Sequence, residues 1–553
     1  MIITFNQMPT QITINTITGV APFNIYLSDD PIHTTVYIAT ISTTFYVFNV
    51  PTIIDNLTAY ILKVVDSNGC IVYENLNINI PQTPTMTPTM TPTPTPTPIP
   101  LSFTSVWRTV SYLESITLPY VISGTYSGTI DWGDGNTDVN SYANRTHTYD
   151  DPGDYTVTIT GDLVKWKFNN TGDKLKIIEI IHWGQFDDGS STNAFYGCSN
   201  LVLTSVTDIP NNLSPNLTGF FRNCTSITTI NHLNSWNVID VVLFNYTFRG
   251  CSNFDQDLGN WDMSGALIIW GMFLECFIFN NGGSDSIRYW DVSNVTNMNS
   301  VFNGCYLFNQ PIGDWVTTSM TSAAGTFGSC YNFDQDLGNW NMSNVQRIDS
   351  MFFSSTSFNN GGSPSISGWT FSNSLTNIDQ TFQNALLFNQ PINNWERLGS
   401  TLSGVTSSYA MFSSATTFNQ NVGDWNMSNN TNSSRMFGNS TLFNNGGSSS
   451  INNWDVTNIT NMGSMFVDSS FDQPIESWNV ISLTAATGMF NNTPISVINY
   501  DNLLVGWASL GSLLQPSVEL GANGLQYTIS IAGASRTYLN GTKLWVITGD
   551  TGI

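Results

Sequence analysis

The chain has 553 residues, of which 10% are charged and 13% are aromatic; 39 acidic residues against 15 Lys and Arg give a net charge of −24. This balance argues against nucleic-acid binding and against attachment to anionic membranes, because both need clustered basic side chains. No apolar run reaches the roughly 18 to 20 residues of a membrane span, so we expect no membrane insertion.

Residues 1–80 have the alternating pattern of a small β-sandwich, with short apolar runs at 12–17 and 44–50 separated by turn residues. The start, MIITFNQMPTQ, lacks the basic and apolar regions of a secretory signal, and we expect no Sec leader. TGVAPFNIYLSDD (18–30) and NLTAYILKVVDSNGCIVYENLNI (56–78) resemble the SprB-type Ig-like repeats of bacterial surface proteins. This module is our candidate for attachment to other proteins.

Residues 81–100, PQTPTMTPTMTPTPTPTPIP, form the clearest boundary in the chain. Alternating proline forbids helix and central strand and favours polyproline II, which at about 3.1 Å per residue would span roughly 60 Å. We interpret this segment as a spacer; a ligand for a proline-recognition domain is the alternative.

Residues 101–161 contain TIDWGDGNTDV (129–139) and THTYDDPGDYTVTITG (146–161). These motifs resemble the PKD-type Ig-like domain, whose signature includes W-G-D-G and a later H-x-Y. The resemblance implies a second β-sandwich with Trp132 in its core and a tight turn at Asp134 and Gly135. Asp131, Asp134 and Asp138 are either a calcium site or, as we favour, structural carboxylates of that turn.

One pattern recurs from about residue 190 onward, with tryptophan every 24 to 30 residues: Trp236, Trp261, Trp290, Trp315, Trp340, Trp369, Trp395, Trp425, Trp454 and Trp478. One phenylalanine column is in phase with them: Phe195, Phe221, Phe248, Phe273, Phe302, Phe327, Phe352, Phe382, Phe412, Phe437, Phe466 and Phe490. In many units another phenylalanine follows six residues later, as Phe308 follows Phe302. A unit of about 25 residues cannot bury these rings alone, so the repeat predicts stacked coils with shared aromatic columns.

Cysteine marks a third column, three residues after the repeat phenylalanine, at Cys198, Cys224, Cys251, Cys276, Cys305 and Cys330. Later units place Ser, Ala or Thr there, which indicates a small buried slot occupied by packed thiols rather than a zinc site. A disulfide between neighbouring coils is the alternative. Asn or Asp after the second phenylalanine predicts a further column that hydrogen-bonds backbone at turns.

Three long units carry an extra N-G-G-S segment, which places the insertions at one edge of the stack. That edge is our candidate binding rim for glycans, a tolerated loop being the alternative. Its candidate residues are Asn281, Gly282, Ser284, Asn360, Ser363, Asn445 and Ser448.

The unit WDVSNVTNMNSVFNGCYLFNQPIGDW (290–315) resembles BspA-type leucine-rich-repeat surface proteins, including the family first catalogued from mycoplasma lipoproteins. The resemblance implies a mostly β, leucine-rich-repeat-like solenoid of about eleven or twelve coils over 193–495. It also implies a strand near Val292–Val295 in each coil, followed by a helical turn. Residues 162–192 and 496–553 would cap the ends.

The sequence contains no catalytic motif that we can identify, and we expect neither enzyme activity nor a cofactor nor a metal site. Paired carboxylates such as Asp255 and Asp257 are compatible with glycosidase chemistry. Their equivalents in other units are Asn and Pro, which favours a structural turn.

The modules, the spacer and the missing export signal favour a bacteriophage virion component, such as a head fibre, tail fibre or decoration protein. Its first module would contact other virion proteins, and its solenoid would bind a host glycan or protein, with a homotrimer as one possible assembly. A bacterial cell-surface adhesin of the BspA type is the alternative.

Overall fold

The computed structural model describes residues 2–8, 11–18, 23–28, 35–41, 46–49, 59–65, 67–68, 71–77, 102–396 and 401–553. The chain divides into two compact units, Met1–Thr97 and Pro98–Ile553, and each is considered by itself. The segment predicted to be a spacer, 81–100, lies outside the described residues, as does Cys70.

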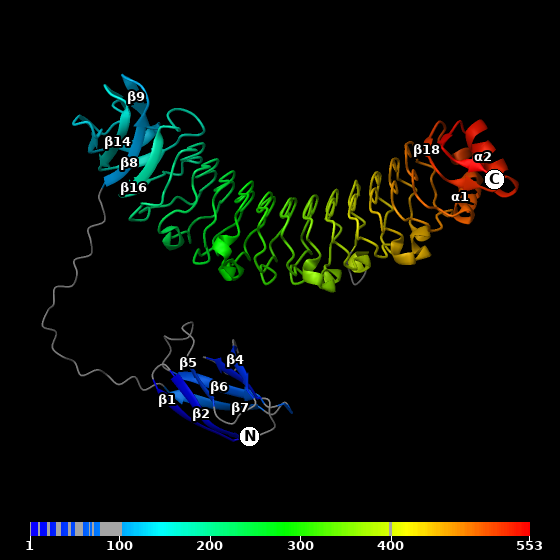
Figure 1. Ribbon diagram of the computed structural model, residues 1–553, viewed down its shortest axis with the longest axis horizontal. Helices are drawn as coiled ribbons and strands as arrows, with labels where there is room; N and C mark the ends of the chain where they lie inside the picture. Colours follow the sequence, from blue (N-terminus) through cyan, green and yellow to red (C-terminus); the bar gives the residue numbers. More distant parts are fainter. Residues whose placement is uncertain are drawn as a thin grey trace. The chain divides into compact units, whose positions relative to one another are not determined.

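The first unit contains two antiparallel sheets (Figure 1). One has the strand order β1-β2-β5 and the other β4-β3-β6-β7. Their bounds are β1 Ile2–Met8, β2 Gln11–Thr18, β3 Phe23–Ser28, β4 Thr35–Ile41, β5 Tyr46–Asn49, β6 Ala59–Val65 and β7 Ile71–Asn77. Ile25 and Val64, which pair across β3 and β6, are both fully buried.

The second unit begins with strands that form a five-stranded sheet, β12-β11-β14-β8-β16, a two-stranded sheet, β13-β9, and a three-stranded sheet, β10-β15-β17. Their bounds are β8 Ser102–Thr109, β9 Glu114–Thr117, β10 Tyr120–Tyr126, β11 Thr129–Asp131, β12 Thr137–Val139, β13 Thr146–Tyr149, β14 Gly153–Thr160, β15 Leu163–Trp166, β16 Ile177–His182 and β17 Phe186–Asp187. Trp132 is fully buried, as predicted, and the left-handed φ of Gly135, 96°, gives the expected tight turn.

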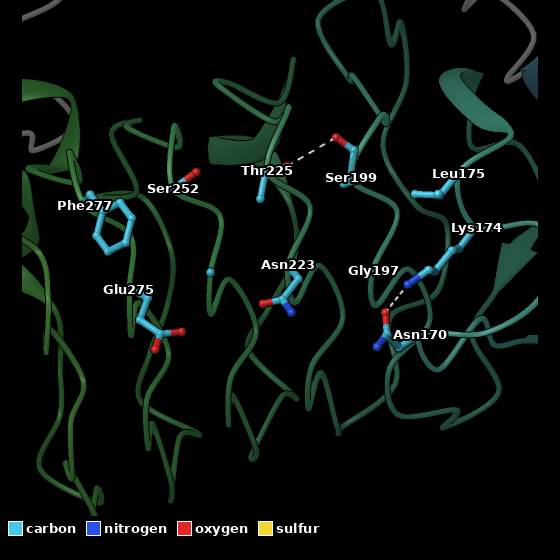
Figure 2. Close-up of a pocket in the computed structure, with 11 residues that line it drawn as sticks. Asn170, Lys174, Leu175, Gly197, Ser199, Asn223, Thr225, Ser252, Glu275 and Phe277 are labelled. Atoms are coloured by element: carbon cyan, nitrogen blue, oxygen red, sulfur yellow. Dashed lines mark hydrogen bonds between the residues drawn. The ribbon is translucent and has the colours of Figure 1, made fainter.

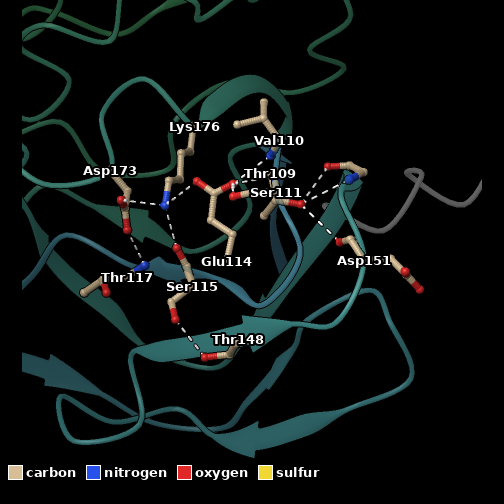
Figure 3. A network of polar contacts seen from close by, with 11 residues as sticks. Thr109, Val110, Ser111, Glu114, Ser115, Thr117, Thr148, Asp151, Asp173 and Lys176 are labelled. Carbon is tan, nitrogen blue, oxygen red and sulfur yellow. Dashed lines mark hydrogen bonds and ion pairs between the residues drawn. The ribbon is translucent and has the colours of Figure 1, made fainter.

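The predicted boundary between 161 and 162 is not a structural division. β15 pairs with β10 and β16 pairs with β8, so the segment expected to form a separate cap completes the sheets of the preceding module. Figure 3 shows a polar tie between the same two segments, in which Lys176 Nζ lies 3.0 Å from Glu114 Oε1 and 3.1 Å from Asp173 Oδ1. Because of this sheet pairing and this ion network, residues 102–187 form one structural module.

The repeats that follow lie side by side in a row of coils, which we call the repeat stack and define as residues 190–495 (Figure 1). Single parallel bridges join successive coils, and one column of bridges links Asn216, Leu243, Ile268, Asn297, Ser322, Arg347, Asn377, Ser407, Asn432, Asn461 and Ala485. The strand expected at Val292–Val295 is wrong: this segment is a turn closed by the Val295 amide on the Val292 carbonyl, and the bridge lies at Asn297.

The expected helical turn beside each repeat phenylalanine is also wrong. The residues two positions before and two positions after it, such as Ser300 and Gly304 around Phe302, have left-handed φ angles, and this alternation prevents a helix. Amides of alternate residues instead donate to the next coil, as Phe302 does to the Thr326 carbonyl at 3.0 Å. A polar backbone ladder therefore runs along the stack.

Short 3-10 helices lie along one edge of the stack in Figure 1. They are η2 Leu233–Ser235, η3 Asn281–Gly283, η4 Asp285–Tyr289, η5 Asn360–Gly362, η6 Pro364–Gly368, η7 Asn393–Glu396, η8 Asn445–Gly447 and η9 Ser449–Asn453. All of them except η2 and η7 lie where the long units insert their extra residues. The prediction that the insertions share one edge is confirmed.

The end of the chain closes the stack with α1 Val497–Ser509, η10 Gly511–Leu513, β18 Glu519–Gly521, β19 Gln526–Tyr527, α2 Ile529–Gly541, β20 Val546–Thr548 and β21 Thr551–Gly552. The Gly521 carbonyl accepts the Phe490 amide at 2.9 Å, so β18 satisfies amides of the last coil. Asp550, whose side chain is 0% exposed, pairs with Arg536 at 2.6 Å and holds this terminal segment together.

Candidate functional site: the columns and surfaces of the repeat stack

The repeat phenylalanines are buried and stack on one another from coil to coil. Phe273 and Phe302 have ring centroids 5.8 Å apart, and Phe302 and Phe327 have centroids 6.0 Å apart, with nearly parallel planes. The second phenylalanine of each unit stacks on the first, as Phe308 does on Phe302 at 3.9 Å. Aromatic pairs at these separations add to the free energy gained by burying the rings, so the column is a core.

The tryptophans form a second buried column with a repeated hydrogen bond. Trp315 stacks between Trp290 and Trp340 at centroid distances of 6.1 and 6.3 Å. From Trp261 onward each indole N–H of the column donates to a carbonyl of the preceding coil, as Trp290 does to Leu258 and Trp261 does to Leu233. The buried indole N–H of Trp236, at the start of the column, has no such partner. Trp507 lies on α1 and still donates to Ile475 at 3.2 Å, which extends the column into the terminal segment.

The six cysteines in the described residues are free and buried. Five of these thiols donate to the backbone carbonyl of the repeat phenylalanine in the preceding coil: Cys224, Cys251, Cys276, Cys305 and Cys330. Ser355 and Thr493 make the same bond from the same slot, while Ala385 and Ala415 simply fill it. Burial raises the pKa of Cys251 to about 12, which removes the thiolate needed for nucleophilic or redox chemistry.

The predicted Asn and Asp column hydrogen-bonds the backbone, as expected. The Asn309 amide donates to Asn280 Oδ1 at 2.9 Å, and the Asp334 amide donates to Asn309 Oδ1 at 2.9 Å. Asp255 and Asp257 belong to the same type of turn: Asp255 Oδ1 accepts the Gly282 amide and Asp257 Oδ1 accepts the Gly259 amide. These two carboxylates therefore accept backbone amides, one from the next coil and one from the same turn.

Three of the seven residues of the predicted binding rim are buried. Asn281, Asn360 and Asn445 are each 0% exposed, and their side-chain oxygens accept the amides of Leu258, Leu337 and Val422. Their side-chain amides donate to the carbonyls of Ser284, Ser363 and Ser448. Gly282 is exposed and the three serines are half-buried, each capping the following 3-10 helix. The three asparagines therefore have a structural role, because their buried side-chain amides hold the N-G-G segment in place through these hydrogen bonds.

The carboxylates of the W-G-D-G turn also have separate structural partners. Asp131 accepts the Gly133 amide, Asp138 accepts the Trp132 indole N–H at 2.9 Å, and Asp134 bonds His147 Nε2 at 2.7 Å. Within the described ranges, no cluster of His, Cys, Asp and Glu is arranged to hold a metal ion. In the same ranges no helix is long and apolar enough to cross a membrane.

A surface groove of about 420 Å³, which was not predicted from the sequence, lies on the first coils of the stack (Figure 2). Two rows of residues line it, together with Asn170: Leu175, Ser199, Thr225, Ser252 and Phe277 form one row, and Lys174, Gly197, Asn223, Gly250 and Glu275 form the other. The signal was present in the sequence, since the position four residues after the repeat phenylalanine changes from small hydroxyls to Phe277, Tyr306 and Tyr331.

A row of arginines and aromatics also reaches the surface of these coils. The Arg222 guanidinium lies 4.6 Å from the Tyr196 ring centroid, and Arg249 lies 5.3 Å from that of Tyr246. Trp270, which is 40% exposed, packs beside Tyr246 at 5.0 Å. Exposed aromatic surface is thus concentrated near the beginning of the stack.

A family model described as "Mycoplasma protein of unknown function, DUF285" matches residues 190–285, 280–395, 363–449 and 446–503, which together span more than half of the chain. The chain belongs to this family. The DUF285 matches confirm the predicted resemblance to the mycoplasma repeat family, and a family of such repeats fits a surface protein with a non-enzymatic, adhesin-like role. No curated protein and no solved structure shows significant similarity to the chain.

Proposed function

We propose that this protein is a non-enzymatic adhesion protein that displays the repeat stack as a binding surface. The proposal rests on the contrast between the interior of the stack, which holds the potentially reactive groups, and its surface, which exposes aromatic side chains. The thiols and the repeated carboxylates are buried or bonded to backbone, whereas large aromatic side chains are exposed: Trp270, Phe277, Tyr289 and Tyr331. Exposed apolar patches on a soluble chain mark interaction sites.

The finer architecture is part of the same proposal. We propose Ig-like β-sandwiches of the SprB type at 1–80 and of the PKD type from 101 onward, and a leucine-rich-repeat-like solenoid over 193–495. The sheets of the two modules support the β-sandwich assignments, and the coil-to-coil bridges support the solenoid. In this arrangement the first module attaches the protein to its carrier, and the solenoid presents its surface to a host glycan or protein.

Two carriers are compatible with this role. A bacteriophage virion, with the protein as a head fibre, tail fibre or decoration protein, is supported by the modular organisation alone. A bacterial cell surface is supported in addition by membership of a mycoplasma family. Antibodies against the purified full chain distinguish them: labelling of intact cells supports the second carrier, and labelling of purified particles supports the first.

The adhesion role itself is tested by binding of the fluorescently labelled full chain to intact cells from environments in which the source organism grows. We expect saturable binding that excess unlabelled protein displaces. If the chain binds no cell, glycan or surface protein above the level of an unrelated acidic control protein, the proposal is wrong.

A further inference from the structure

The groove of Figure 2 has larger side chains at its two ends and short, uncharged side chains between them. Phe277 and Glu275 bound one end, and Leu175 and Lys174 bound the other. Between these ends lie Ser199, Asn223 and Ser252, which are half-buried, and Thr225, which is exposed and whose hydroxyl donates to the Ser199 carbonyl at 3.4 Å. The groove is a row of neutral hydrogen-bonding groups along the axis of the stack.

Phe277 supplies a flat apolar wall at its end of the groove. One face of its ring stacks on Tyr306 in the next coil, with centroids 4.9 Å apart, and Tyr306 stacks on Tyr331 at 4.8 Å. In the preceding coil the equivalent position is Ser252, which is too small to cover the other face. The aromatic column therefore stops where the groove begins, and it leaves one ring face open to a ligand.

The backbone beneath the groove is already paired. The Gly197, Asn223 and Gly250 amides donate to carbonyls of the next coil at 2.8, 2.7 and 2.8 Å. An extended peptide binds such a surface mainly by adding a strand to a free edge, and these coils offer none of those amides. The ligand must instead be recognised by side-chain hydroxyls, an amide and a ring face.

This combination matches the chemistry of a sugar chain. Each sugar presents hydroxyls that both donate and accept, and the C–H face of a pyranose packs on an aromatic ring. Steps between stacked rings of 4.8 to 4.9 Å are close to the length of one sugar unit, so successive sugars would meet equivalent groups in successive coils. The net charge of −24 repels strongly anionic chains, which favours a neutral one.

We propose that this groove is the glycan-binding site of the protein and that it takes a short neutral oligosaccharide lying along the stack. One terminal sugar packs on the free face of Phe277, and the hydroxyls of the middle sugars bond Ser252, Thr225 and Asn223. The assignment deepens the adhesion role proposed above and rests on it. It moves the binding surface from the N-G-G rim to the face that carries the Phe277 column.

The test extends the aromatic column artificially at either end. Ser252→Tyr adds a ring on the free face of Phe277 and fills the groove, while Thr356→Tyr adds a ring beyond Tyr331, outside the groove. Both variants continue an existing stack, so both should fold with an unfolding temperature at least equal to that of the wild type. An array of short neutral and sialylated oligosaccharides is probed with the full chain and both variants, and each bound sugar is then titrated in solution.

We expect the wild type to bind neutral oligosaccharides, Thr356→Tyr to bind within about twofold of it, and Ser252→Tyr to lose at least about tenfold in affinity. Phe277→Trp should retain binding and Phe277→Ala should lose it. Equal binding by wild type and Ser252→Tyr would overturn the site. Binding to cells or peptides without binding to any sugar overturns the glycan assignment and leaves the adhesion role intact, whereas loss of all cell binding by the wild type removes both.

Discussion

The N-terminal half of the repeat stack, residues 190–340, and its C-terminal half, residues 341–495, share one interior and differ in their surfaces. In both halves the phenylalanine rings stack coil on coil, at 5.8 Å for Phe273 and Phe302 and at 5.6 Å for Phe412 and Phe437. Cys occupies the small slot throughout the N-terminal half, and Ser, Ala or Thr replaces it in the C-terminal half. The slot therefore selects for size, and its hydrogen bond is optional.

The surfaces diverge more than the slots do. The N-terminal half exposes Trp270, Phe277, Tyr289 and Tyr331, with Arg222 and Arg249 beside other rings. In the described part of the C-terminal half, the exposed large hydrophobic residues are Leu386, Leu387 and Leu442. Packing constrains the interior equally in both halves, so this difference in surface is our reason for proposing that binding takes place in the N-terminal half and that the C-terminal half has a supporting role.

The largest effect we expect comes from removing one ring from the interior. Phe327→Ala leaves a cavity between Phe302, Phe333 and Phe352, and it should lower the free energy of unfolding by about 3 to 5 kcal/mol. Phe437→Ala, its counterpart in the other half, should cost about the same. Urea unfolding of the full chain, followed by tryptophan fluorescence, measures both; a cost confined to one half would contradict a shared interior.

A smaller loss should follow from the buried asparagines of the long units. Asn281→Ala strands the Leu258 amide and the Ser284 carbonyl, and it should lower the free energy of unfolding by about 1 to 3 kcal/mol. Asn445→Ala provides the matched change in the C-terminal half. Thermal unfolding measures the loss. Unchanged stability together with weakened ligand binding would show that Asn281 acts in ligand binding and not in holding the fold.

The small slot of an N-terminal coil should tolerate the residue types that occupy it in the C-terminal half. Cys305→Ala removes one hydrogen bond to the Phe273 carbonyl and should cost about 1 kcal/mol, whereas Cys305→Leu overfills the slot and should cost about 1 to 3 kcal/mol. Burial raises the pKa of these thiols, so in a Cys70→Ser background they should react with a thiol reagent only after unfolding. Rapid labelling of the native protein would show that the slots open.

The periodic interior could be predicted from the sequence because its constraints repeat. Phe, Trp, Cys and Asn each return to one geometrical position in every coil, so their spacing alone indicates columns. The conformation that carries them could not be predicted in this way: alternation of left-handed residues such as Ser300 and Gly304 depends on coil-to-coil amide bonds, and its positions accept Ser, Glu and Ala as well as Gly and Asn.

Burial of Asn281 and the groove beside Ser252 escaped prediction for opposite reasons. A polar N-G-G segment is typical of exposed turns, yet here the side chain of its asparagine bonds backbone inside the stack. The groove arises where side chains are too short to cover the Phe277 ring, and such a site is defined only by the coils on either side. The boundary at 161 failed because β15 and β16 add to sheets formed by distant strands.

The smallest effect we expect concerns the ion pair between Glu114 and Lys176, which lies before the first coil. The Val110 amide and the Lys176 ammonium lower the pKa of Glu114 to about 2, from 4.5 in an unfolded chain. Its contribution to stability is therefore complete above pH 4.5 and is lost as the pH falls toward 2. Because such partly solvated pairs contribute about 0 to 1 kcal/mol, Glu114→Gln should lower the unfolding temperature slightly at neutral pH and not at all near pH 2. Asp154→Asn, which breaks the more exposed pair with Arg108, is the control and should change less; a pH dependence that survives Glu114→Gln would place the acid-sensitive contact elsewhere.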